Sequence, residues 1–197
     1  LMPPKKFYEN AINHLYQEEL GEIITDDKNI YEELQQLYAG NPDILSKIRF
    51  YGNDAISLGT LYSFETQIQR AISERVWMKS GAYLIIQPTE ALTVIDVNSG
   101  KNTSGKNAEE YYYKINLEAA AEISRQLRLR NISGIVIVDF INMAKEEQRK
   151  ELMHQFRLSL KEDPVPVRLV DITKLGLVEL TRKKERKTLL EQVAQLR

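Results

Sequence analysis

The chain has 197 residues, of which 43% are hydrophobic and 28% are charged, and its formal net charge is −1. This hydrophobic content is enough for a folded core, and the small net charge means that a nucleic-acid surface would need local clusters of basic residues. Cysteine is absent, which excludes disulfides and cysteine-ligated zinc and fits the reducing cytoplasm, where we expect the protein to act. No apolar run approaches the roughly 20 residues of a membrane span. The start, "LMPPKK", lacks the apolar segment of a secretion signal, and we expect the sequence to be a fragment.

The first third of the chain predicts helices that alternate with short strands. Apolar residues at helical spacing predict helices over 7–20, 29–38 and 61–72, and apolar runs at 22–26 and 46–52 predict strands. The composition changes near residue 72, which we take as the boundary between two domains, 7–71 and 72–197.

Three β-rich runs follow this boundary: "ERVWM", "AYLIIQ" and "ALTVIDVN". They are separated by "KSG" and "PTE", which are turn compositions, so we predict a strand meander. A loop rich in glycine, serine, lysine and asparagine covers 99–107.

A long helix is predicted over 108–130, because apolar residues recur on an i, i+4 stripe. The continuous apolar run "IVIVDF" (135–140) predicts a strand of a sheet interior, covered on both faces. A helix over 145–161, a strand over 165–172, and a short strand leading into a terminal helix complete the chain.

Two aspartates stand at the ends of apolar strands. Asp96 lies in "VIDVNSG" (94–100) and Asp139 ends "IVIVD", with one loop and one long helix between them. That separation allows a strand–helix–strand crossover, and parallel strands would bring both carboxylates to one edge of the sheet. Alternation along the strand puts Asn98 on the same face as Asp96.

Hard oxygen ligands favour magnesium, with manganese able to substitute, and magnesium keeps several waters rather than a full protein cage. We therefore predict that Asp96 and Asp139 bind the metal, and that Asn98 orients a water or a phosphate oxygen. Such a site suits phosphoryl transfer or phosphodiester hydrolysis. The alternative is that each aspartate only caps a helix or closes a turn.

A second hypothesis arises from "GKNTSGKN" (100–107), which nearly matches the phosphate-binding loop of nucleotide triphosphatases. Asn107 stands where the magnesium-binding hydroxyl should be, and this hypothesis leaves Asp96 and Asn98 without a role.

A third hypothesis is a non-catalytic fragment that binds RNA or a partner protein. Its basis is the basic tract 182–187, which contains Arg182, with Lys174 nearby. Because glutamates are interleaved with these residues, a solvated helix face is the simpler explanation of the tract. Trp77 and Tyr111–Tyr113 could stack on bases, although three consecutive helix positions point in different directions and most of these residues should pack.

Three stretches together resemble the bacterial ribonuclease E/G family. They are "EALTVIDVNSGK" (90–101), "NLEAAAEISRQLRLRNISGIVIVDFINM" (116–143) and "GLVELTRKK" (176–184). The resemblance covers most of 72–187 and is looser over 7–71.

The resemblance implies an endoribonuclease that acts on single-stranded RNA, requires magnesium and leaves a 5′-phosphate and a 3′-hydroxyl. The family's metal-binding aspartates fall on Asp96 and Asp139, and its supporting asparagine falls on Asn98. An α/β fold is implied, in which a DNase-I-like subdomain (72–197) follows part of a ribonuclease-H-like subdomain (7–71). By this analogy Lys101 and Lys106 are at most RNA contacts, together with Lys174 and Arg182.

The chain departs from the family pattern in several places. Asn142 and Asn131 replace acidic residues of many members, but neither position is a metal ligand in the family. Nothing resembles the family's RNA-clamping barrel, its 5′-monophosphate pocket or the cysteine motif of its zinc-linked dimer, so no zinc is expected here. Homo-oligomerisation is expected only for a full-length protein, and we expect this fragment to cleave weakly or not at all.

Overall fold

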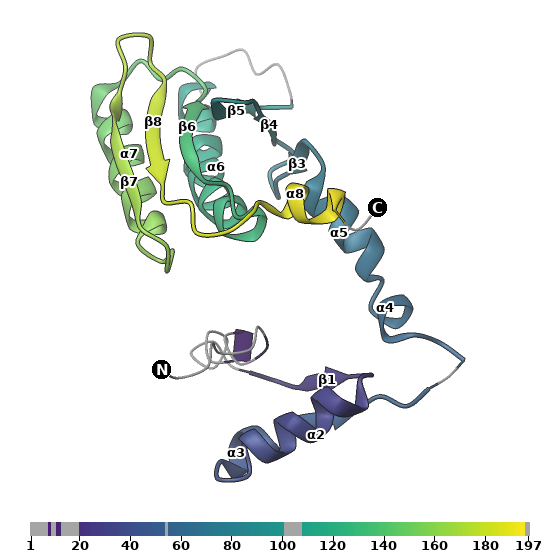
Figure 1. The fold of residues 1–197 in the computed structure, drawn as a ribbon. Helices are drawn as coiled ribbons and strands as arrows, with labels where there is room; N and C mark the ends of the chain where they lie inside the picture. Colours follow the sequence, from purple (N-terminus) through teal and green to yellow (C-terminus); the bar gives the residue numbers. More distant parts are fainter. Residues whose placement is uncertain (1–7, 9–10, 13–19, 54, 101–107, 196–197) are drawn as a thin grey trace. The chain divides into compact units, whose positions relative to one another are not determined.

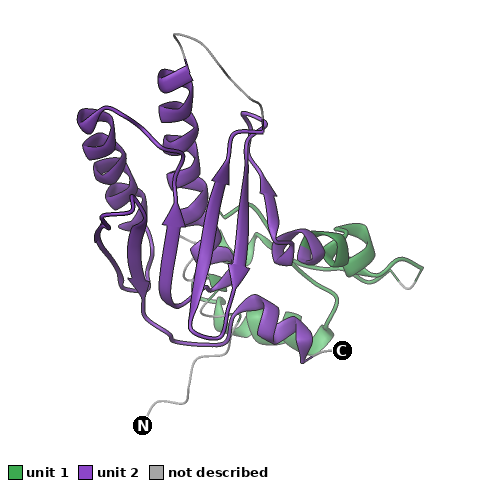
Figure 2. Ribbon diagram, turned by 90° about the horizontal axis from the view of Figure 1, so that it is seen from above, with its two compact units in different colours: residues 1–67 green, residues 68–197 purple. Residues whose placement is uncertain are grey.

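The computed structural model of the chain describes residues 8, 11–12, 20–53, 55–100 and 108–195. The chain divides into two compact units, Leu1–Gln67 and Ile68–Arg197 (Figure 2). The division lies within helix α5 (Phe64–Ile72), close to the position where the change in composition predicts a boundary.

The first unit contains a small parallel sheet with helices between its strands. Its elements are β1 (Ile23–Thr25), α2 (Lys28–Leu37), α3 (Pro42–Leu45), β2 (Ile48–Phe50) and α4 (Leu58–Leu61). Asp27 caps α2 by accepting hydrogen bonds from the backbone N–H groups of Asn29 and Ile30. Of the helix predicted over 7–20, only four residues are described, and one of them, Ile12, is buried in the core of this unit.

The helix predicted over 61–72 is interrupted. Its first residue ends α4, and α5 begins only at Phe64. Between them Ser63 has a φ of +52°, a left-handed conformation that a right-handed helix cannot include.

The second unit contains a six-stranded mixed sheet and two long helices (Figure 1). After α5, its elements are β3 (Arg75–Trp77), β4 (Tyr83–Pro88), β5 (Leu92–Asn98), α6 (Ala108–Arg130), β6 (Gly134–Asp139), α7 (Glu146–Leu160), β7 (Val167–Ile172), β8 (Val178–Arg182) and α8 (Leu189–Ala194). The strand order is β3-β4-β5-β6-β8-β7. The predicted meander is β3-β4-β5, which is antiparallel, and the predicted crossover through α6 makes β5 and β6 parallel. The predicted α/β class is therefore confirmed.

One face of this sheet packs against α6 and α7. The predicted stripe of α6 is buried there, together with apolar residues of α7 and alternate residues of the central strands. The opposite face, which we call the open face, carries half-buried and exposed side chains from β3, β4, β5 and β6.

The prediction that "IVIVDF" is covered on both faces is wrong. Val136 and Val138 are fully buried, but Ile135 is 49% exposed and Asp139 is also exposed. Both helices pack on the same side of the sheet, so only alternate residues of β6 enter the core.

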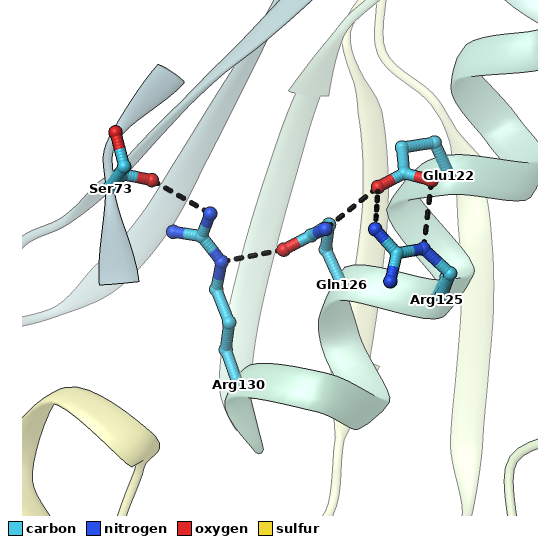
Figure 3. A network of polar contacts seen from close by, with 5 residues as sticks. All are labelled: Ser73, Glu122, Arg125, Gln126 and Arg130. Atoms are coloured by element: carbon cyan, nitrogen blue, oxygen red, sulfur yellow. Dashed lines mark hydrogen bonds and ion pairs between the residues drawn. The ribbon is translucent and has the colours of Figure 1, made fainter. Parts of the chain in front are cut away.

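A polar network joins the last turns of α6 to the segment that leads into β3 (Figure 3). Arg130 donates to the side chain of Gln126 and to the carbonyl of Ser73, both at 2.7 Å. Gln126 in turn donates to Glu122, which also accepts two hydrogen bonds from Arg125. Burial alone would raise the pKa of the Glu122 carboxyl, but these hydrogen bonds outweigh it and hold the pKa below its usual value. Arg130 thus fixes the chain just before β3, although its burial lowers the pKa of its guanidinium.

None of the helices in the described part of the chain combines the length and the apolar content needed to cross a membrane.

Candidate functional site

The two predicted metal-binding aspartates are direct neighbours across β5 and β6. Asp96 pairs with Asp139 in the parallel register, and adjacent strands lie about 4.8 Å apart. Both side chains belong to the open face, because Ile95 and Val138 next to them in sequence point into the core. The tertiary structure therefore brings together two carboxylates that are 43 residues apart in the sequence.

Asn98 contacts Asp96 directly. Its Nδ2 donates a hydrogen bond of 2.7 Å to Oδ2 of Asp96, and both side chains are half-buried. The bond orients the Asp96 carboxylate and uses the amide nitrogen of Asn98, not its oxygen. Among the described residues, no side chain pairs with the carboxylate of Asp139, so its oxygens are available to an external ligand.

A buried asparagine on α6 fixes the chain just after Asp139. Asn116 is fully buried, donates a 2.7 Å hydrogen bond to the carbonyl of Ile141 and accepts one of 3.0 Å from its N–H. This two-point attachment holds the backbone two residues beyond the metal-type aspartate. Sequence reasoning missed Asn116, although its position next to Ile115 of the predicted apolar stripe places a polar amide close to the core side of the helix.

The end of β5 is fixed by a close backbone approach. Gly100 has a φ of +69°, and a Cβ at this position would lie 2.5 Å from the carbonyl oxygen of Gly81 in the β3–β4 turn. Only glycine allows this contact without a shift of the backbone. The strand that carries Asp96 and Asn98 therefore ends against the neighbouring hairpin.

The two carboxylates and the amide oxygen of Asn98 are oxygen ligands, the kind that magnesium prefers in proteins. No group of three or more histidine or acidic side chains comes together within the described ranges. Two carboxylates on one face, one of them unpaired, together with a nearby amide oxygen, could bind one magnesium ion that keeps several waters.

The structure does not support Arg182 as an RNA contact. Its guanidinium is buried, forms an ion pair of 2.8 Å with the buried Asp163, and donates to Asn131 and to the carbonyl of Ile132. Arg182 also pairs with Gly134, at the opposite end of β6 from Asp139. All of these donors are used inside the protein, so an arginine in a basic run is here a structural residue.

Of the other three predicted RNA contacts, only Lys174 lies among the described residues. Lys174 is exposed in the turn between β7 and β8, at the same end of the sheet as Asp139, because β8 begins opposite Val138. Lys101 and Lys106 lie outside the described residues, as does nearly all of the phosphate-loop-like segment.

The remaining basic tract, 183–187, is exposed but distant from the aspartates. It follows β8 at the end that pairs with Gly134, about 17 Å from Asp139 along the strand direction at 3.3–3.4 Å per residue. Lys183 forms an ion pair of 3.3 Å with Glu185, as expected for a solvated segment with interleaved charges.

Comparisons with a family profile and with individual proteins identify the same family. The Ribonuclease E/G family profile matches residues 1–185. The chain is 39% identical to Ribonuclease G of Salmonella typhimurium (strain SL1344) over 86% of its own length and 35% of the relative's. It is 36% identical to Ribonuclease E of Escherichia coli (strain K12), over 88% of the chain and 16% of that protein. It is 37% identical to Ribonuclease E of Synechocystis sp. (strain ATCC 27184 / PCC 6803 / Kazusa), over 96% of the chain and 28% of that protein.

The chain thus spans about a third or less of the length of each of these relatives. The region that matches the family profile includes both Asp96 and Asp139. This chain belongs to the ribonuclease E/G family.

Proposed function

We propose that this chain carries the chemical centre of a magnesium-dependent endoribonuclease that hydrolyses phosphodiester bonds in single-stranded RNA. The main support is the pairing of Asp96 with Asp139 on the open face of the sheet. Membership of the ribonuclease E/G family supports the same activity. We further infer from the family resemblance that residues 72–197 form a DNase-I-like subdomain, and that 7–71 belong to a ribonuclease-H-like one.

The proposed mechanism assigns one task to each of three side chains. Asp96 and Asp139 together provide the negative charge that would hold the metal. A bound magnesium ion would supply neutralisation of the phosphate charge and a lowered pKa for the attacking water. Asn98 fixes the orientation of Asp96 through its 2.7 Å hydrogen bond, and its amide oxygen, which this bond does not use, would orient a water or a phosphate oxygen.

The products are a 5′-phosphate and a 3′-hydroxyl. Attack by water on phosphorus with departure of the 3′ oxygen breaks the P–O3′ bond, and the proton lost by water balances the one gained by the leaving oxygen. Because positioning of the substrate contributes much of an enzyme's rate, we expect the 197-residue chain alone to cleave slowly.

The proposal is tested by paired substitutions of the aspartates. In a full-length protein that contains this chain, Asp96→Asn and Asp139→Asn should each reduce cleavage of a short single-stranded RNA by about 100-fold or more. Asp43→Asn is the matched control, since its carboxylate is 66% exposed and lies in the first unit. All three variants should retain the circular dichroism spectrum of the unmodified protein.

Metal binding can be measured on the 197-residue chain itself. Titration with Mn²⁺, followed by the electron paramagnetic resonance signal of the free ion, should show one site that Asp139→Asn removes and Asp43→Asn retains. Substantial cleavage by either active-site variant would contradict the mechanism. RNA binding with neither metal binding nor cleavage in the full-length protein would instead favour the non-catalytic hypothesis.

A further inference from the structure

Three side chains on the open face lie one or two strands away from Asp96 and have no role in the proposed chemistry. They are Arg75 and Trp77 on β3 and Tyr83 on β4. Val76 and Leu84, their neighbours in sequence, point into the core, so all three of these side chains project from the same face as Asp96.

The strand registers place these residues in two rows that run across the sheet. In one row, Trp77 pairs with Tyr83 and Tyr83 pairs with Asn98. In the adjacent row, Arg75 pairs with Ile85 on β4, and Ile85 pairs with Asp96. Because adjacent strands lie about 4.8 Å apart, Tyr83 is one strand and Trp77 two strands, or about 10 Å, from Asn98.

The two aromatic rings form an ordered but exposed cluster. Their centroids are 5.0 Å apart with an interplanar angle of 57°, and the guanidinium of Arg75 lies 4.6 Å from the Tyr83 ring and 5.6 Å from the Trp77 ring. The contacts with Arg75 are cation–π interactions, which restrict the rings before any ligand binds. Trp77 is nevertheless 62% exposed.

Such exposure is unusual for the largest apolar side chain, and it needs an explanation. Trp77 contributes little to the core, since its neighbour Val76 makes the core contacts of β3. A flat ring that is held in place and open to solvent is the surface on which unpaired nucleobases stack. The exposed cations Arg75 and Lys79, two residues on either side of Trp77, complement a phosphate backbone.

We propose that Trp77 and Tyr83 form a stacking platform for nucleobases of the RNA strand whose scissile phosphate lies at Asp96 and Asp139. The proposal rests on the proposed function, because one RNA strand would contact both the platform and the metal site. Arg75 and Lys79 contact the phosphates of the stacked nucleotides.

The platform gives a physical reason for a preference for single-stranded RNA. A base in a duplex is paired and stacked on its neighbours and cannot reach Trp77. An unpaired base can unstack from its neighbours and stack on the ring. Every base has a π-face, so the platform accepts any of the four bases and adds affinity without reading sequence.

The chain contains a single tryptophan, so its fluorescence reports on Trp77 alone. Short oligoadenylate should quench this emission in the 197-residue chain, measured with EDTA present so that no cleavage occurs. An abasic oligoribose-phosphate of the same length and charge should quench little, and a blunt RNA duplex should also quench little.

Binding measured with fluorescently labelled oligoadenylate should weaken about 5- to 150-fold in Trp77→Ala, the range that corresponds to the loss of one stacked base. Trp77→Phe should retain most of the affinity, because it keeps an aromatic ring. Phe50→Ala, which removes an exposed ring in the first unit, should leave the affinity unchanged. Urea unfolding of Trp77→Ala should show only a small loss of stability, of the size of the ring's exposed contacts with Tyr83 and Arg75, since most of the ring is in water.

Oligoadenylate binding without quenching, or with equal affinity in Trp77→Ala, would overturn the platform, and so would the absence of any binding. Quenching that depends on protein concentration rather than on RNA would also overturn it, because Trp77 would then belong to a protein–protein contact. Failure of the proposed function is separately visible, since it appears as undiminished cleavage by Asp139→Asn and does not affect binding in EDTA.

Discussion

Substitution of Asn116 by alanine tests how the position of Asp139 is maintained. The substitution removes two hydrogen bonds and leaves both the carbonyl and the N–H of Ile141 without a partner. A buried polar group without a partner costs about 1–3 kcal/mol, and Ile141 is half-buried, so the lower part of the range applies to each group. We therefore expect the free energy of unfolding to fall by about 2–4 kcal/mol.

Urea unfolding followed by circular dichroism measures this loss, and Ser124→Ala is the matched control. Ser124 is also buried on α6, but its hydroxyl donates only to the carbonyl of Ala120 in the same helix, at 3.0 Å. That carbonyl keeps its helical partner, and alanine is a better helix former than serine, so this control should lose less than about 1 kcal/mol.

The same variant should affect catalysis in the full-length protein under conditions where it remains folded. Release of Ile141 lets Asp139 shift, and misplacement of a reacting group by about 1 Å can cost about 100-fold in rate. We expect a loss of cleavage of about 10- to 100-fold for Asn116→Ala and little change for Ser124→Ala. Equal stability and equal cleavage in these two variants would refute the idea that Asn116 holds the chain after β6.

Three further substitutions, one of them a control, test two contacts at opposite ends of the sheet. Gly100→Ala should destabilise the protein by about 2–4 kcal/mol, because its Cβ meets the carbonyl of Gly81. Gly176→Ala is the control and should cost only about 1–2 kcal/mol, because its φ is also positive but no atom would lie within 4 Å of the added Cβ. Equal losses for the two variants in urea unfolding would contradict the close approach of Gly100 to Gly81. Asp163→Ala should cost about 3–5 kcal/mol by leaving Arg182 buried without its partner, and a thermal unfolding temperature equal to that of the unmodified chain would show that this ion pair is dispensable.

Much of the local structure could be predicted because local periodicity determines it. The helix predicted over 108–130 is α6, and the apolar runs that contain Asp96 and Asp139 are β5 and β6. A helix of this length between two strands also predicts their parallel pairing, and therefore the meeting of the two carboxylates. These predictions depend only on the spacing of apolar residues and on chain length.

Three features depended on contacts between distant parts of the chain. Arg182 belongs to a basic run, but Asp163 and Asn131 draw its guanidinium into the interior. The continuous apolar composition of β6 predicts burial on both faces, yet both covering helices pack on one side. The sequence predicts that Trp77 either stacks on bases or packs, and the side chain is exposed because Val76, its neighbour in sequence, takes the core side of β3.

The sequence by itself therefore determined the two long helices of the second unit and the two strands that contain Asp96 and Asp139. Only the tertiary structure decided which face of the sheet stays open. It also decided that Asn98 lies opposite Tyr83, and Asp96 opposite Asp139, on the neighbouring strands. The reason is that strand register and helix side are properties of pairs of segments. A single segment carries its own periodicity, but it does not record the partner against which it will pack.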